Sequence, residues 1–465
     1  MPDPAPKTPL YDVAIIGAGV VGCALARRFT LDGARVVVLE KGAEVLDGAS
    51  KANSAILHTG FDAPPGSLEQ ACIAAGYAEY LDIREDLGLP LLKTGAMVLA
   101  WNDEQLAALD GLVEKAHKNG VPDVARLSRA EILQREPQLS PSLKGGFVVP
   151  REYVIDPWAS AHAYILQALA NGAELKRNCE LLSGAFEGGT WALETSTGPV
   201  VAKQVINCAG LYGDIVDTRL TGETRFTIKP RKGQFVVFDK PASALVEAVI
   251  LPVPTSTTKG VVIFRTIFGN LAVGPTAEEQ DSREDASTEA ATLADLRAKG
   301  IEMLPALEAY EVTTVYAGLR PATEFQDYQI SQDEARNYIT VGGIRSTGLS
   351  AALGIARHVA GMNASVSFAG QPITTPIMPT PDRLSNYHPR DWQEEGHGGI
   401  ICHCELVTKR EIEAAFNGPM PPTTLQGLKR RTRVCMGRCQ GFYCTGPLAD
   451  LTKGRLSPAI GERDD

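Results

Sequence analysis

Two features that mark other classes of protein are missing from this sequence. No apolar run approaches the roughly 20 residues that an α-helix needs to cross a bilayer. There is also no excess of basic residues, because the net charge is −10. General binding to the phosphate backbone of a nucleic acid needs a basic face. The sequence therefore predicts no direct membrane span and no nucleic-acid partner.

The segment 1–9 also lacks the apolar core of a secretion signal and is rich in proline. We therefore expect a cytoplasmic protein, which would reach the inner membrane only peripherally and through a partner. The chain has 465 residues, of which 44% are hydrophobic and 22% are charged. This size and composition are typical of a globular protein with about two or three domains.

A strand–turn–helix–strand unit stands at the start of the chain. The apolar run 11–16 has the composition of a buried parallel strand. A glycine-rich turn over 17–22 leads into a helical stretch over 23–31, and a second strand covers 36–39. The order and length of these segments are those of one βαβ unit.

The glycines of this unit follow the pattern G-x-G-x-x-G, at Gly17, Gly19 and Gly22. They allow a tight turn and a close approach of a pyrophosphate to the start of the helix. Glu40 ends the second strand, where a carboxylate can accept both ribose hydroxyls. The motif predicts a dinucleotide site but does not decide between FAD and NAD. Its place near the start of the chain and the β-rich segments that follow favour FAD.

The rest of the chain predicts an α/β fold whose first domain is discontinuous. Strands over 205–210 and 337–341 and helices over 156–170 and 347–359 return to that domain, whereas β-rich segments over 96–101, 234–238 and 261–264 form a separate mixed sheet. We expect a Rossmann-like FAD-binding domain over 1–90, 145–215 and 315–370, a substrate domain with a mixed β-sheet over 91–144 and 216–314, a proline-rich linker over 371–394, and a small helical iron–sulfur module over 395–455.

Small polar residues dominate the segment 50–60, which ends at Gly60. Such a stretch can run beneath a flavin ring and offer it backbone N–H groups and hydroxyls. His58 titrates near neutral pH and could take a proton from a substrate hydroxyl. It could equally be bonded to the backbone and only shape the pocket.

Two arginines, Arg320 and Arg345, stand in glycine-containing turns that the fold would bring together. The planar fork of arginine suits a phosphate or a carboxylate, although a lone arginine usually forms a surface ion pair. The predicted catalytic residues are His58, Arg320 and Arg345. The predicted cofactor-binding residues are Gly17, Gly19, Gly22, Glu40, Lys41, Ser50, Asn53, Ser54, Ala209, Gly210, Gly318, Gly348, Leu349 and Ser350.

Five of the nine cysteines crowd into the segment 402–444. Disulfides are rare in the cytosol, so a local cluster there favours a metal. The spacing is C-x-C and then C-x4-C, which departs from the C-x2-C knuckles of zinc ribbons, although four thiolates can bind either zinc or a 2Fe-2S cluster. We predict a 2Fe-2S cluster on Cys402, Cys404, Cys439 and Cys444, with Cys435 as an extra cysteine that could replace one of them.

These motifs carry two family resemblances. The segments 53–62 and 65–68 resemble flavoproteins of the D-amino-acid-oxidase type, most closely the anaerobic, iron–sulfur-bearing glycerol-3-phosphate dehydrogenases of bacteria; L-2-hydroxyglutarate dehydrogenases share much of the first segment. The cysteine segments resemble bacterioferritin-associated-ferredoxin-like modules. The resemblance implies FAD, a 2Fe-2S cluster, hydride transfer to the flavin and a place for Arg320 beside the substrate. At Glu69-Gln70 the sequence departs from these relatives, which carry a basic residue there.

The sequence therefore predicts an FAD-dependent dehydrogenase that oxidises a small hydroxylated substrate such as glycerol 3-phosphate. Electrons would leave through the cluster to a partner subunit or a quinone-linked carrier. The alternatives are an L-2-hydroxy acid dehydrogenase and an enzyme that oxidises the C–N bond of an amino or imino acid. A third alternative, outside catalysis, is an assembly subunit whose cysteine module binds zinc for docking.

Overall fold

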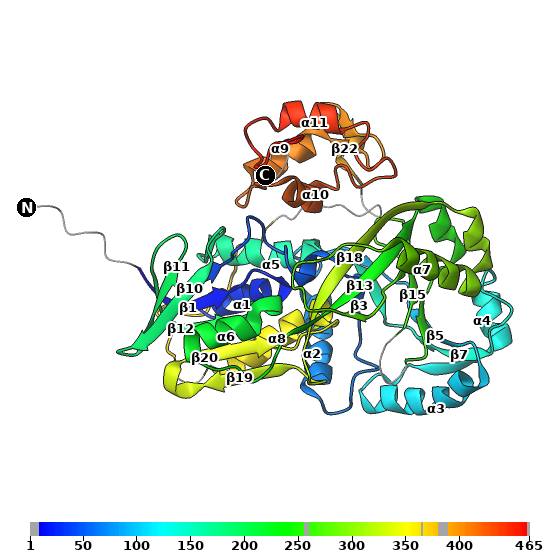
Figure 1. Cartoon of the computed structure of the whole chain (residues 1–465), viewed down its shortest axis with the longest axis horizontal. Helices are drawn as coiled ribbons and strands as arrows, with labels where there is room; N and C mark the ends of the chain where they lie inside the picture. Colours follow the sequence, from blue (N-terminus) through cyan, green and yellow to red (C-terminus); the bar gives the residue numbers. More distant parts are fainter. Residues whose placement is uncertain (1–8, 255–259, 364–365, 380–388, 463–465) are drawn as a thin grey trace, which may run out of the picture.

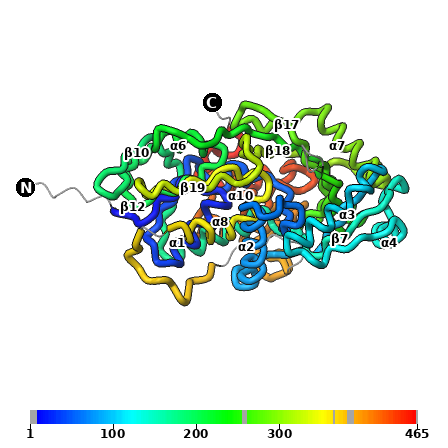
Figure 2. Tube along the Cα trace, turned by 90° about the horizontal axis from the view of Figure 1, so that it is seen from below, coloured from blue at the N-terminus to red at the C-terminus, as the bar shows by residue number. Residues whose placement is uncertain are grey.

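The computed structural model describes residues 9–254, 260–363, 366–379 and 389–462. These residues form two halves, each built on a large sheet, and a small module that lies on one side of both (Figure 1). The view from below places the module behind the junction of the two halves (Figure 2). Among the described helices, none combines the length and the apolar composition needed to cross a membrane.

The first half contains an eight-stranded sheet around the predicted βαβ unit. Parallel strands form its centre and are buried on both faces, which is why they read as continuous apolar runs. Its strands are β1 (Leu10–Ile16), β2 (Val36–Leu39), β9 (Glu174–Lys176), β10 (Leu181–Glu187), β11 (Thr190–Thr195), β12 (Val200–Asn207), β19 (Gln329–Asp333) and β20 (Tyr338–Gly342). Its helices are α1 (Val20–Leu31), α2 (Leu68–Ile83), α5 (Ala159–Ala170), α6 (Gly213–Thr221) and α8 (Gly348–Met362).

The second half contains a nine-stranded mixed sheet. Its strands are β5 (Ala96–Ala100), β6 (Ala125–Ser128), β7 (Gly145–Val149), β13 (Lys229–Phe238), β14 (Val249–Pro252), β15 (Val262–Arg265), β16 (Leu271–Gly274), β17 (Glu278–Glu279) and β18 (Val312–Ala322). The helices α3 (Asp103–Lys118), α4 (Arg129–Arg135) and α7 (Ala290–Met303) pack against it. A small sheet of β3 (Ile56–Leu57), β4 (Leu91–Leu92) and β8 (Tyr153–Ile155) joins the segment of His58 to the chain near 154.

Two strands lie in a different sheet from the one that the predicted boundaries give them. Strand β7 pairs with β5 and β6, and β18 pairs with β13 along its length, so both belong to the second sheet. The boundaries predicted at 145 and 315 were wrong for these strands. Strand pairing is a tertiary contact, and a short apolar run does not reveal which sheet it will join.

The cysteine module consists of β21 (Ile400–Cys402), β22 (Val407–Thr408), α9 (Lys409–Asn417), α10 (Leu425–Thr432) and α11 (Thr445–Leu451). Helix α9 begins with a capping box between Thr408 and Glu411. The module has a small apolar core of its own, which includes Val407, Ile412 and Leu428. The two helices predicted here, over 409–416 and 424–431, are confirmed to within one residue.

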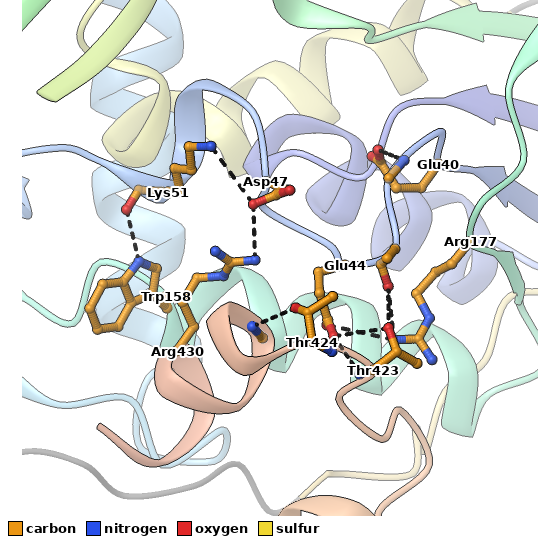
Figure 3. Close-up of polar contacts among 12 residues, drawn as sticks. Glu40, Glu44, Asp47, Lys51, Trp158, Arg177, Thr423, Thr424 and Arg430 are labelled. Carbon is orange, nitrogen blue, oxygen red and sulfur yellow. Dashed lines mark hydrogen bonds and ion pairs between the residues drawn. The ribbon is translucent and has the colours of Figure 1, made fainter. Parts of the chain in front are cut away.

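A buried carboxylate, Glu44, holds the module against the first half (Figure 3). It accepts hydrogen bonds from Arg431 Nη1 at 2.9 Å and from the backbone N–H groups of Thr423 at 2.6 Å and Thr424 at 3.1 Å. A Cβ atom on Gly427 would lie 2.1 Å from the carboxyl carbon of Glu44, so only glycine lets α10 come this close. The docking of the module therefore depends on one charge and one missing side chain.

Replacing Glu44 by alanine should release this contact, because the Arg431 guanidinium would stay buried without its ion partner. Breaking a buried ion pair in this way costs about 3–5 kcal/mol. We expect an equal loss in the free energy of unfolding of the module, measured by denaturant titration of the whole chain. Glu85→Ala is the control, since its ion pair with Arg84 is exposed and such pairs contribute less than about 1 kcal/mol. Equal effects of the two changes would contradict the role given to Glu44.

Candidate functional site

A cavity of about 880 Å³ lies between the two halves. Residues of both sheets form its wall, from the glycine-rich turn after β1 to the facing strands β13 and β18. All three predicted catalytic residues line it, as do twelve of the fourteen predicted cofactor-binding residues. The other two, Gly22 and Ser350, are not part of the wall. Residues that are far apart in the sequence thus meet around one space.

The glycine-rich turn is packed too tightly for any side chain at two positions. Gly17 has a φ of +101°, and a Cβ atom there would lie 2.7 Å from the carbonyl oxygen of Cys208. A Cβ atom on Gly22 would lie 2.0 Å from the carbonyl oxygen of Gly17. The first glycine shapes the turn, and the third lets helix α1 pack against it, as the motif requires.

Polar groups gather where this turn meets the cavity. Glu40 accepts hydrogen bonds from the backbone N–H groups of Ala18 at 2.7 Å and Gly42 at 2.8 Å. Burial raises the pKa of the Glu40 carboxyl, and the two donors oppose that rise. The Ser50 hydroxyl accepts from the N–H of Val20 at the start of α1, at 3.0 Å. A helix start, an acid and a hydroxyl beside one cavity fit the phosphates and ribose of a dinucleotide.

His58 is oriented by a carboxylate that the sequence did not reveal. Its Nδ1 atom lies 2.7 Å from Oε2 of Glu152, and Oε1 of Glu152 accepts from the N–H and the hydroxyl of Thr59. The backbone N–H of His58 donates to the Ser350 hydroxyl at 2.9 Å. Glu152 is fully buried and lies 94 residues further along the chain, so no local pattern pointed to it. With Nδ1 held by Glu152, Nε2 is the ring nitrogen left for chemistry.

Arg320 stands on β18 beside Arg231 of β13, and both line the cavity. Its Nη2 atom donates to the carbonyl oxygen of Thr276 at 3.1 Å, whereas Nη1 is buried and has no hydrogen-bond partner in the described part of the chain. Burial first, and the neighbouring Arg231 second, lower the pKa of Arg320 to about 10. A Cβ atom on Gly233 would lie 2.5 Å from Nη2, so this glycine makes room for the guanidinium. An unsatisfied cationic donor in a cavity suits an anionic ligand.

Arg345 is held differently, although it lines the same cavity. It donates a short hydrogen bond to the carbonyl oxygen of Gln326 and lies 3.9 Å from the carboxylate of Glu69. Glu69 is buried and also accepts from the Thr347 hydroxyl at 2.7 Å. Part of the positive charge of Arg345 is thus balanced within the protein. The structure places Arg345 closer to the ion-pair alternative than Arg320.

The predicted cysteine ligands lie in two pairs in the module. Cys402 is within hydrogen-bonding reach of Cys444, and Cys404 is within reach of Cys439. Among the residues that the structure describes, no three side chains of His, Cys, Asp or Glu converge at the distances of a single ion. Two thiol pairs suit a 2Fe-2S cluster, in which each iron takes two cysteines. The donor set therefore fits the cluster that the spacing predicts.

The fifth cysteine of the module, Cys435, lies close to one of these pairs. Its Sγ atom is 3.4 Å from Sγ of Cys444, and both residues are buried. Cys439 is different, because the backbone N–H of Tyr443, together with those of Gly441 and Phe442, lowers the pKa of its thiol. A thiol that already lies in a ring of N–H donors is prepared to bind a metal as the thiolate.

Comparisons with known proteins agree with this geometry. Residues 12–362 match the family described as FAD dependent oxidoreductase, named DAO, and residues 400–453 match the BFD-like 2Fe-2S binding domain. The chain belongs to the DAO family of FAD-dependent oxidoreductases. FAD and a 2Fe-2S cluster are the cofactors of this oxidoreductase. The predicted family and α/β fold are confirmed.

Relatives of this oxidoreductase cover nearly all of its length. It is 32% identical over 464 residues to the glycerol 3-phosphate dehydrogenase of Caloramator mitchellensis, covering 97% of this chain and 96% of that one. It is 24% identical to one of the subunits of the anaerobic glycerol-3-phosphate dehydrogenase of Escherichia coli K12, covering 95% and 87%. The FAD-bound L-α-glycerophosphate oxidase structure of Mycoplasma pneumoniae aligns with a TM-score of 0.73 at 26% identity, covering 79% and 97%.

Two cysteine variants test the ligand assignment. Cys439→Ser should abolish the cluster, because it removes one of the four predicted thiolate ligands. Cys435→Ser, a change of the same size in the same loop, should keep it. The measurement is the iron and acid-labile sulfide per chain in oxygen-free purified protein, with the flavin content as a check on folding. If Cys435→Ser loses the cluster and Cys439→Ser keeps it, Cys435 has taken the place of a predicted ligand.

Proposed function

We propose that this oxidoreductase oxidises glycerol 3-phosphate, or a closely related polyol phosphate, at a C–OH group. The observation that carries the proposal is the pairing of two chemistries in one cavity. His58, held by Glu152, offers a base, and Arg320 offers a cationic donor without a protein partner. A phosphorylated alcohol needs both. The names of the full-length relatives support this substrate class.

The residues of the chain divide the reaction between them. Nε2 of His58 takes the substrate hydroxyl proton, and Glu152 stabilises the imidazolium that forms, as a carboxylate does beside a catalytic histidine. Arg320 holds the substrate phosphate through Nη1, and Arg231 adds a second positive charge. FAD, when bound along the cavity, supplies the acceptor for the hydride of the substrate C–H bond. Glu40 and the turn at Gly17 and Gly19 hold its adenosine end.

The electrons leave through the cluster, one at a time, to a partner subunit or a quinone-linked carrier. Phe442 and Tyr443 support this exit, because they lie between Cys439 and Cys444 and are 81% and 73% exposed. Large exposed apolar side chains often mark an interaction site. Attachment to a membrane would then be peripheral and made by the partner. The relative in Escherichia coli is by name one of several parts of an enzyme.

A substrate panel tests the proposal directly. We expect anaerobic addition of glycerol 3-phosphate to bleach the flavin absorbance rapidly. 2-Hydroxyglutarate and glycine should bleach it far more slowly, because neither presents a phosphate next to an oxidisable C–OH group. Bleaching by 2-hydroxy acids alone would support the alternative L-2-hydroxy acid dehydrogenase. Bleaching by an amino acid, with release of ammonia, would show C–N oxidation in its place.

Glu152→Gln tests the orientation of the base. The amide lacks the charge that stabilises protonated His58, so we expect the rate constant of flavin bleaching to fall toward the loss of the base itself, about 10²- to 10⁴-fold. The affinity for substrate should change much less, because Glu152 does not contact the phosphate site. Glu136→Gln is the matched control, since Glu136 is also buried but accepts only from backbone N–H groups outside the cavity. A normal bleaching rate in Glu152→Gln would contradict the role of the pair.

A further inference from the structure

A buried column of side chains runs from the wall of the cavity toward the cysteine module. Trp158, just before α5, donates from its indole Nε1 to the carbonyl oxygen of Lys51 at 3.1 Å. Lys51 belongs to the segment 50–60, which is predicted to run beneath the flavin, and it lines the cavity. Figure 3 shows the indole beneath this segment. The first member of the column is therefore fixed to the cavity wall.

The column continues through two further side chains. Trp158 stacks on Phe268, with ring centroids 5.7 Å apart and an interplanar angle of 20°. The guanidinium carbon of Arg433 lies over the other end of the contact, 3.8 Å from the centroid of Phe268. All three residues are buried, with exposed fractions of 8%, 5% and 4%. Side chains packed at this density leave no room for water between them.

The far end of the column reaches the cluster ligands. Arg433 Nε donates to Oε2 of Glu405 at 2.9 Å, and Glu405 directly follows Cys404 in the chain. Glu405 is also buried, and its carboxylate lies 3.4 Å from the amine of Lys240 in the second half. The contacts of the column are thus made between stacked rings, between a cation and a ring, or between opposite charges, and its members are buried.

The same segment of the cavity wall also positions the module. Asp47 lies 3.8 Å from Lys51 and 3.2 Å from Arg430 of α10, so one carboxylate joins the flavin-side segment to the helix that precedes Arg433 (Figure 3). The contact between Arg433 and Phe268 is therefore held in place from both sides of the interface.

We propose that Trp158 and Phe268 are the electron path from the flavin to the cluster, with Arg433 and Glu405 completing it at Cys404. This inference rests on the proposed function, since it requires that electrons leave through the cluster. Electron tunnelling weakens steeply with distance and is better supported by packed atoms than by gaps, and the column is a continuous packed path. It is a path for electrons only, because its contacts contain no chain of exchangeable protons.

The electrons balance in single steps. The two electrons of the substrate C–H bond reach the flavin together as hydride, while the hydroxyl proton goes to His58. Each electron then crosses the column separately and reduces one ferric ion of the cluster to ferrous. A one-electron carrier protein oxidises the cluster again before the second electron follows. The hydrogen that arrived as hydride leaves the flavin as a proton to solvent.

A second connection between cavity and cluster is less continuous. The Tyr316 hydroxyl donates to the carbonyl oxygen of Asn53 at 3.0 Å, and two residues away on β18 the Thr314 hydroxyl donates to Oε1 of Gln440 at 3.1 Å. Between these two contacts the route follows the strand itself, and its last contact is exposed. This route supplies a matched control, because Thr314→Val removes its contact with the cluster loop and leaves the column intact.

The experiment uses the full chain loaded with FAD and cluster, under anaerobic conditions. The flavin is reduced by a light flash with a sacrificial donor, so that the result does not depend on the identity of the substrate. Absorbance then follows oxidation of the flavin and reduction of the cluster together. The variants are Trp158→Leu and Phe268→Leu, which remove a ring, Trp158→Phe, which restores one, and Thr314→Val. Iron, sulfide and flavin contents and the denaturation midpoint show whether the module stays folded and docked.

We expect both leucine variants to slow cluster reduction about tenfold, equal to about 1.4 kcal/mol in activation free energy. Cofactor contents and the denaturation midpoint should stay near those of the unchanged protein, and Trp158→Phe and Thr314→Val should transfer electrons normally. Leucine variants that transfer at the normal rate, or slowing by Thr314→Val alone, would overturn the column as the path. If the cluster of the unchanged protein stays oxidised, the proposed exit through the cluster fails as well. Loss of cluster or docking in a leucine variant would also overturn it, since those side chains would then be structural.

Discussion

The buried carboxylate of Glu44 is the interaction on which the arrangement of the molecule depends. It lies in the loop after β2, four residues beyond Glu40, so the loop that borders the dinucleotide end of the cavity also holds the cysteine module. Arg431 and two backbone N–H groups converge on it where Gly427 leaves no side chain in the way. A single loop thus fixes the distance between the two cofactor sites.

The cavity depends on a second meeting of distant parts. The base pair of His58 and Glu152 comes from segments next to the small sheet, whereas Arg320 and Arg231 come from neighbouring strands of the second sheet. Neither half contains a complete site. The flavin-side segment 50–60 lies between them, because it carries His58 into the cavity and Lys51 onto the indole of Trp158. Chemistry and electron exit therefore share one segment.

Local patterns in the sequence predicted what local forces determine. Gly17, Gly19 and Gly22 predicted the βαβ unit because the turn tolerates no Cβ atom at its tightest points, and the C-x-C and C-x4-C spacings predicted the thiol pairs because each lies within one loop. The helices of the module followed from their caps and apolar spacing. His58, Arg320 and Arg345 were found as side chains able to bind or take a proton, and the structure places all three at the cavity.

What the sequence did not reveal consists of contacts between distant segments. Glu152 and Glu44 are isolated acids in their own neighbourhoods, and only the folded chain shows that both are buried against cations or donors. The sheet joined by β7 and β18 is decided by pairing partners, which an apolar run does not encode. Trp158 and Phe268 are ordinary core aromatics by composition, and their meaning comes from what lies at each end of the stack.

The central claim is that one chain collects two electrons from an alcohol and releases them singly. The most direct test is low-temperature electron paramagnetic resonance on anaerobic protein mixed with glycerol 3-phosphate and no other reductant. The account predicts a reduced-cluster signal that grows as the flavin absorbance bleaches and disappears when a one-electron acceptor is added. A flavin that bleaches while the cluster remains oxidised and silent would contradict it.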